Sequence, residues 1–112
     1  MVTWPAVVVA VGAEEHRPPL YGLGEHETVL TQREFAAAMA AKRATGAKRV
    51  AMIQCVGMRD DEHPYCSRFC CSQALHNALL LLEQDPEAHV YILYRDMMTY
   101  GLQEELYEEA RK

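Results

Sequence analysis

Apolar residues concentrate in three short runs along the chain: Ala6–Val11, Arg49–Gln54 and His89–Tyr94. Each run is rich in β-branched or aromatic side chains, which favour strands. The first run is apolar throughout, and this pattern is typical of a strand that is buried on both faces. The sequence therefore predicts three strands.

Apolar residues with helical spacing occupy the stretches between and after these runs. Thr31-Gln-Arg-Glu34 has the form of a capping box, and Phe35 and Met39 follow it at helical spacing. A second helix is expected after residue 70 and is ended by Asp85-Pro86, while Leu102–Lys112 predicts a closing helix. The buried face of the second helix is expected to consist of Ala74, Leu75, Ala78, Leu79 and Leu82.

The order of these elements predicts an α/β protein. Val50–Asp96 runs strand, loop, helix, strand, and two apolar strands joined by a helical crossover form a parallel βαβ unit. We expect residues 1–48 to supply a strand, a loop and a helix, and residues 49–112 to supply the βαβ segment. The two parts are expected to form one compact unit with a short, mostly parallel sheet.

Composition limits the class of partner. The chain has 112 residues and a formal net charge of −5, which argues against a nucleic acid or an anionic membrane as its partner. No signal-peptide pattern is visible, and the apolar runs are too short to span a bilayer. We therefore expect a cytoplasmic protein, in which stable disulfides are rare and clustered cysteines indicate metal ligands or redox groups.

The four cysteines fall at one edge of the predicted sheet. Cys55 follows the second strand, and Cys66, Cys70 and Cys71 precede the next helix. The carboxyl end of a strand and the amino end of its crossover helix meet at the same edge of a parallel sheet, so the four sulfurs can converge. A helix N-terminus carries partial positive charge and favours thiolates. Four thiolates suit either zinc or an iron–sulfur cluster.

The spacing of the cysteines bears on this choice. On a continuous helix Cys66 and Cys70 would share a face, and Cys71 would point about 100° away from Cys70. One tetrahedral zinc fits that spread poorly, whereas a cluster offers separate irons to its ligands. Three other interpretations stay open: a zinc site completed by His63 or His76, a redox-active vicinal pair, and buried free cysteines.

Several short stretches resemble the A subunit of heterodisulfide reductase, which carries flavin and iron–sulfur clusters in electron-bifurcating complexes. The resemblance covers nearly the whole chain, and its cysteine motif is the most specific part. The matching stretches are Ala6–Gly12, Val29–Phe35, Gln54–Gly57, Tyr65–Cys71, Tyr94–Asp96 and Thr99–Gly101.

The resemblance implies a fold, cofactors and partners. The fold would be a three-layer, Rossmann-like fragment of the flavoprotein disulfide reductase type, with Val11 and Gly12 in contact with flavin. FAD would bind only together with an upstream segment or a partner chain that completes its site. A 4Fe-4S cluster would be held by Cys55, Cys66, Cys70 and Cys71.

The function implied is an electron-transfer module of an oxidoreductase complex, rather than an enzyme that is catalytic alone. Its partners would be other subunits of the complex, and exposed sheet edges also allow self-association. Two alternatives belong to other classes: a zinc-stabilised interaction module without a redox role, and a thiol–disulfide redox protein.

Overall fold

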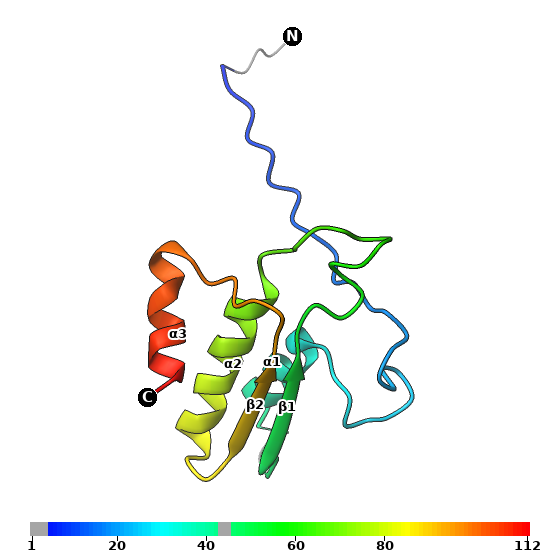
Figure 1. Cartoon of the computed structure of the whole chain (residues 1–112). Coiled ribbons are helices and arrows are strands. Elements are labelled where there is room, and N and C mark those ends of the chain that lie inside the picture. Colours follow the sequence, from blue (N-terminus) through cyan, green and yellow to red (C-terminus); the bar gives the residue numbers. More distant parts are fainter. Residues whose placement is uncertain (1–4, 43–45) are drawn as a thin grey trace.

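The computed structural model describes residues 5–42 and 46–112, so the predicted segment 1–48 is described except for residues 1–4 and 43–45. Within these described ranges, three helices and a short 3-10 helix accompany a sheet of two strands, which confirms the α/β class (Figure 1). In chain order the elements are α1 (Gln32–Ala40), β1 (Arg49–Ile53), α2 (Cys70–Gln84), β2 (His89–Leu93), the 3-10 helix η1 (Gly101–Gln103) and α3 (Glu104–Ala110).

The predicted parallel βαβ unit is present. Strands β1 and β2 pair in parallel, with a register that runs from Arg49 opposite His89 to Ile53 opposite Leu93. The amide of Gln54 donates to the carbonyl oxygen of Leu93 at 2.9 Å and extends the pairing beyond the end of β1. The loops that follow both strands therefore start side by side at one edge of the sheet.

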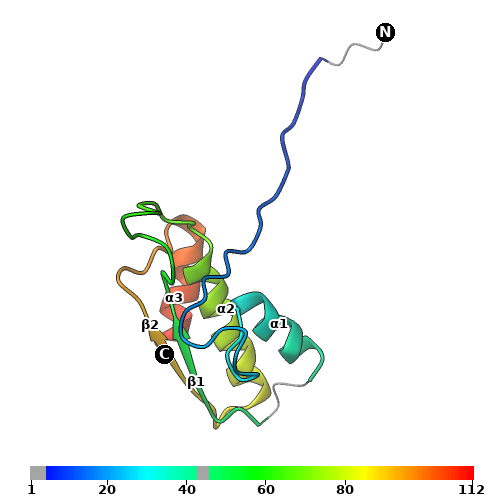
Figure 2. The same ribbon diagram turned by 90° about the vertical axis from the view of Figure 1, so that its right-hand side faces the viewer.

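The helices cover only one face of the sheet, as the two views show (Figures 1 and 2). Met52 on β1 is 4% exposed and packs with Ala74 and Ala78 of α2. Side chains of the opposite face lie open to solvent, and Tyr91 and Leu93 are 57% and 52% exposed. The described residues thus form two layers where three were predicted, because no described helix covers the second face.

The first predicted strand is absent. Residues Ala6–Val11 form no regular element, and the side chains of Val7, Val8 and Val9 are 79–86% exposed. A strand exists only where its backbone pairs with a neighbour, and no described strand lies beside this segment. We call residues 5–12 the arm, which extends away from the rest of the chain (Figure 1).

The capping box at the start of α1 is confirmed. The Glu34 amide donates to Thr31 Oγ1 at 3.2 Å, and the Thr31 amide donates to Glu34 Oε2 at 2.9 Å. Met39, further along α1, is 2% exposed and packs with Leu81 of α2. This contact attaches α1 to the rest of the core.

The buried face of α2 is close to the predicted one. Ala74, Leu75 and Ala78 are buried as expected, whereas Leu81 is buried in place of Leu79 and Leu82, which are only partly covered. The helix ends at Asp85, as predicted. The difference arises because α1 packs over the side of α2 that carries Leu81.

The last helix starts later than predicted. Gly101–Gln103 form the 3-10 turn, the side chain of Leu102 is 91% exposed, and α3 then packs along α2. Within the described ranges, no helix has the length and apolar character that crossing a membrane would require.

Candidate metal centre

Cys55 lies immediately beyond β1, at the edge of the sheet where both strands end. Its backbone has φ +61°, and the Met58 amide donates to the Cys55 carbonyl oxygen at 3.2 Å, which closes a turn. A left-handed backbone at a residue other than glycine is uncommon and is concentrated at tight turns and functional sites. This turn reverses the chain at the end of the strand and leaves the Cys55 side chain half-buried.

Cys66 lies in the loop before α2, because the helix begins only at Cys70. The interpretation that placed Cys66 and Cys70 on one continuous helix is therefore wrong. Arg68, with φ +64°, turns the chain between them, and its amide donates to Cys66 Sγ at 3.3 Å. Ser67 Oγ lies 3.6 Å from Cys70 Sγ. Because Cys66 is in this loop, helix geometry does not determine where its sulfur points.

Cys71 is the buried member of the set, with 2% of its surface exposed. Its Sγ donates to the carbonyl oxygen of Asp96, 3.8 Å away in the loop after β2. Burial is the main cause that raises the pKa of the Cys71 thiol. A backbone hydrogen bond with Met98 lowers this pKa, whereas the negative charges of the other three cysteines raise it further. The other three cysteines thus act electrostatically on Cys71.

The four cysteine side chains are not preassembled as metal ligands. Across residues 5–42 and 46–112, no three His, Cys, Asp or Glu side chains are grouped closely enough to hold one metal ion. The donor set itself suits an iron–sulfur cluster, whose irons are bound by separate thiolates. Binding would require these side chains to move together, and three of the four lie in or beside loops.

Buried hydrogen-bond donors without partners occur on the segments that carry the cysteines. Among the described residues, these atoms include Gln54 Nε2, Arg59 Nη1 and Thr99 Oγ1. Gln54 directly precedes Cys55, and Thr99 follows the Met98 backbone that interacts with Cys71. Buried donors almost always have an acceptor. An anionic centre with sulfur acceptors fits this set of donors, so the residues present are compatible with a cluster.

The histidines considered for a zinc site have other surroundings. His76 lies on the exposed side of α2. The His63 ring lies 5.1 Å from the ring of His16, and the His63 amide donates to Asp60 Oδ1 at 2.7 Å. Asp60 also accepts from the Glu62 amide at 3.1 Å, so its carboxylate stabilises the acidic loop formed by residues 60–62. These contacts give both His63 and the acidic loop a structural role.

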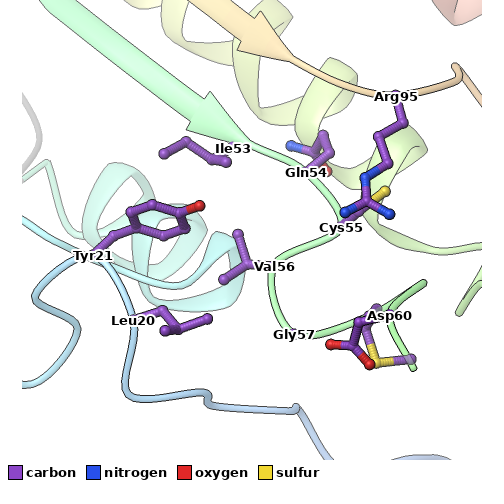
Figure 3. A pocket seen from close by; sticks show the side chains of 10 residues that line it. Leu20, Tyr21, Ile53, Gln54, Cys55, Val56, Gly57, Asp60 and Arg95 are labelled. Atoms are coloured by element: carbon purple, nitrogen blue, oxygen red, sulfur yellow. The ribbon is translucent and has the colours of Figure 1, made fainter. Parts of the chain in front are cut away.

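A pocket of about 300 Å³ opens beside Cys55 (Figure 3). Leu20 and Tyr21, from the loop before α1, face Val56 across it, and Arg95 lies at its other side with Cys55. None of Leu20, Tyr21 and Arg95 was predicted as a site residue. Arg95 follows β2, and it could have been predicted as a site residue from the parallel topology, because β1 and β2 end at the same edge of the sheet.

The two residues predicted to contact flavin lie on the arm. Val11 is 89% exposed, and Gly12 has φ +69° with open space around its Cα. Neither residue lines the pocket beside Cys55. Flavin contact at Val11 and Gly12 stays a prediction.

Comparison with known proteins identifies relatives over nearly the whole chain. The A subunit of a ferredoxin:CoB–CoM heterodisulfide reductase from Methanosarcina acetivorans is 32% identical over an alignment that covers 96% of the chain and 19% of that protein. The chain is similar to one segment of the heterodisulfide reductase A subunit. Proteins of Methanopyrus kandleri and Methanocaldococcus jannaschii, both named as an iron–sulfur subunit of CoB–CoM heterodisulfide reductase, are 36% and 37% identical.

The similarity to heterodisulfide reductase concerns a part of those proteins. The chain spans about a fifth of their length, 19% in each of these three relatives, while 95–96% of the chain is aligned. No protein-family model matches the chain.

Proposed function

We propose that this chain is an iron–sulfur electron-transfer module of a complex like heterodisulfide reductase, with Cys55, Cys66, Cys70 and Cys71 as the ligands of a 4Fe-4S cluster. The observation that supports the proposal is the position of the cysteines in the βαβ unit: Cys55 follows β1, Cys66 lies in the loop before α2, and Cys70 and Cys71 begin α2. The names of two relatives as iron–sulfur subunits support it.

The cluster supplies one-electron transfer when it is bound. The chain's own residues supply thiolates from two separate loops and a partly buried setting. Cys71 anchors the set from within the core, while Cys55, Cys66 and Cys70 lie nearer to solvent. A centre that is partly exposed on one side can exchange electrons with a partner docked there, so no residue of the chain needs to act as a general acid or base.

Flavin and partner subunits belong to the same proposal. The arm offers the exposed backbone of Val11 and Gly12, and FAD would bind there only when another segment or chain completes the site. The relatives' names describe reductases that act with other components, such as ferredoxin. We infer that this module also works in a cytoplasmic complex with other redox subunits.

The thiol–disulfide alternative fits the geometry less well. A nucleophilic cysteine needs an accessible thiolate with a lowered pKa. Cys71 is buried and its pKa is raised. Its neighbour Cys70 could still be reactive, so stoichiometric metal in the purified chain is the observation that separates the two functions.

The test is anaerobic purification of the chain followed by iron, zinc and sulfide analysis. We expect brown protein with iron and sulfide, and loss of most iron in each of Cys55→Ser, Cys66→Ser, Cys70→Ser and Cys71→Ser. Ser67→Ala is the matched control, because this side chain contacts Cys70 Sγ and is not a proposed ligand. Colourless protein with stoichiometric zinc would instead establish the interaction module, and Cys55→Ser with full iron would remove Cys55 from the ligand set.

A further inference from the structure

Arg59 is fixed in place by the loop that also carries Cys55. The Arg59 amide donates to the His63 carbonyl oxygen at 2.7 Å, and its own carbonyl oxygen accepts from Arg95 Nη1 at 2.6 Å. Gly57, between Cys55 and Arg59, has φ +65°, and a Cβ there would lie 2.8 Å from His16 Nε2. The backbone around Arg59 is therefore held on both sides and depends on a glycine in the turn.

The Arg59 side chain joins the two loops at the edge of the sheet. Its Nη2 pairs with Asp96 Oδ2 at 2.8 Å, and the Asp96 carbonyl oxygen accepts from Cys71 Sγ at 3.8 Å. Asp96 follows β2, whereas Arg59 follows β1. One ion pair thus connects the Cys55 loop to the segment in contact with Cys71.

One end of the guanidinium is left without an acceptor. Arg59 Nη1 is buried and has no hydrogen-bond partner among the described residues. Arg59 belongs to the loop that follows Cys55, and its partner Asp96 contacts Cys71 Sγ, so the cation is attached to segments that carry two of the cysteines. Asp96 raises the pKa of Arg59 most, and Cys55 raises it further. A guanidinium has five N–H donors in a fixed fork, so anchoring Nη2 also sets the direction of Nη1.

We propose that Arg59 is a positioning residue for the iron–sulfur centre: Asp96 holds its guanidinium through Nη2, and Nη1 donates to the centre at the Cys55 side and raises its reduction potential. This inference rests on the proposed function. Reduction adds negative charge to the centre. A cation and a hydrogen bond at a ligand sulfur stabilise that charge and raise the potential.

The test is a redox titration of the iron-loaded chain, followed by electron paramagnetic resonance under anaerobic conditions. Arg59→Gln should keep its iron and show an equilibrium constant for one-electron reduction at least tenfold lower, which corresponds to about 59 mV. Arg59→Lys keeps the charge but loses the planar fork, so we expect a smaller shift in the same direction. Arg33→Gln removes an equal charge from the exposed side of α1 and should leave the potential unchanged.

The outcomes separate this inference from the proposed function. Unchanged potential in a fully loaded Arg59→Gln chain overturns the role of Arg59 and leaves the cluster assignment intact. If Arg59→Gln loses iron, the Arg59→Lys chain is measured instead. A lowered reduction potential in Arg59→Lys supports the inference. An unchanged potential, or loss of iron in this variant as well, means that Arg59 only helps the loop to fold, and overturns the inference. A wild-type chain without iron overturns the proposed function itself.

Discussion

Asn77, in the middle of α2, donates through Nδ2 to the backbone carbonyl oxygen of Gln32 on α1 at 3.0 Å and to its side-chain Oε1 at 2.7 Å. Its Oδ1 accepts from Gln73 Nε2 at 3.1 Å, and the residue is completely buried. The buried Asn77 amide therefore connects α2 to α1, although Asn77 and Gln32 are 45 residues apart in the sequence.

Replacing Asn77 should therefore destabilise the chain. Asn77→Leu leaves the partly buried Gln32 oxygens without the Asn77 donor, and we expect the free energy of unfolding to fall by about 1–3 kcal/mol. Urea denaturation of the wild type and the variant measures the change. His76→Ala, one residue away on the exposed side of α2, is the control and should change stability little. Equal stabilities for Asn77→Leu and the wild type would show that this contact does not hold α1 on α2.

The ion pair at the far end of the sheet predicts a pH dependence. Lys48 Nζ lies 2.8 Å from Asp85 Oδ2, and this hydrogen bond is the main cause that lowers the pKa of Asp85 below its ordinary value near 3.8. A lowered carboxyl pKa in the folded state contributes stability above the unfolded pKa, and that stability is lost as pH falls through the folded pKa.

Asp85→Asn should accordingly be less stable than the wild type at neutral pH, and the difference should shrink as pH falls below about 3.8 and disappear below the lowered pKa of the folded state. Unfolding curves at neutral and acidic pH measure this change. Glu87→Gln serves as the control, because Glu87 is 3.5 Å from Lys48 Nζ and its side chain is 87% exposed. A stability difference for Asp85→Asn that stays constant across this pH range would contradict the assignment.

The exposed arm predicts association. Val8, at 86% exposure, lies among other apolar side chains whose backbone has no strand partner among the described residues. Unpaired apolar strands add to the open edges of other sheets. We expect the chain to associate with itself, or with a protein that pairs a strand with the arm. Sedimentation of the iron-loaded chain over a dilution series measures the self-association.

Val8→Lys should weaken this association, because a charge in a paired apolar strand must be desolvated. Ala13→Lys adds the same charge at an exposed position just beyond the arm and should have a smaller effect. A well-folded monomer at every concentration, without a partner, would contradict the prediction.

Local patterns were sufficient for the elements whose signals lie within a few residues. Thr31 and Glu34 satisfy each other's backbone, so their capping box marks the start of α1 in the sequence itself. The alternation of buried and exposed positions along Arg49–Ile53 likewise follows from a strand with a single covered face. These signals depend on residues that are close in the sequence, so they can be recognised without knowledge of the rest of the fold.

Ala6–Val11 shows where such patterns fail. Its β-branched residues are compatible with a strand, but a strand requires backbone partners from elsewhere in the chain or from another chain. The described residues supply none, and the segment stays extended and exposed. A buried strand could not be distinguished from an unpartnered one by composition alone.

The sequence by itself determined the α/β class and the parallel crossover, because the order of two apolar strands and the helix between them specifies that connection. The convergence of the four cysteines on one centre stays a prediction. Only the tertiary structure decided that Cys71 is buried against Asp96 while Cys55 remains half-exposed, and that Arg59 pairs with Asp96. The physical reason is distance along the chain. Cys71 and Asp96 are 25 positions apart, and Arg59 and Asp96 are 37 positions apart, so both contacts depend on how the loops after β1 and β2 fold against each other.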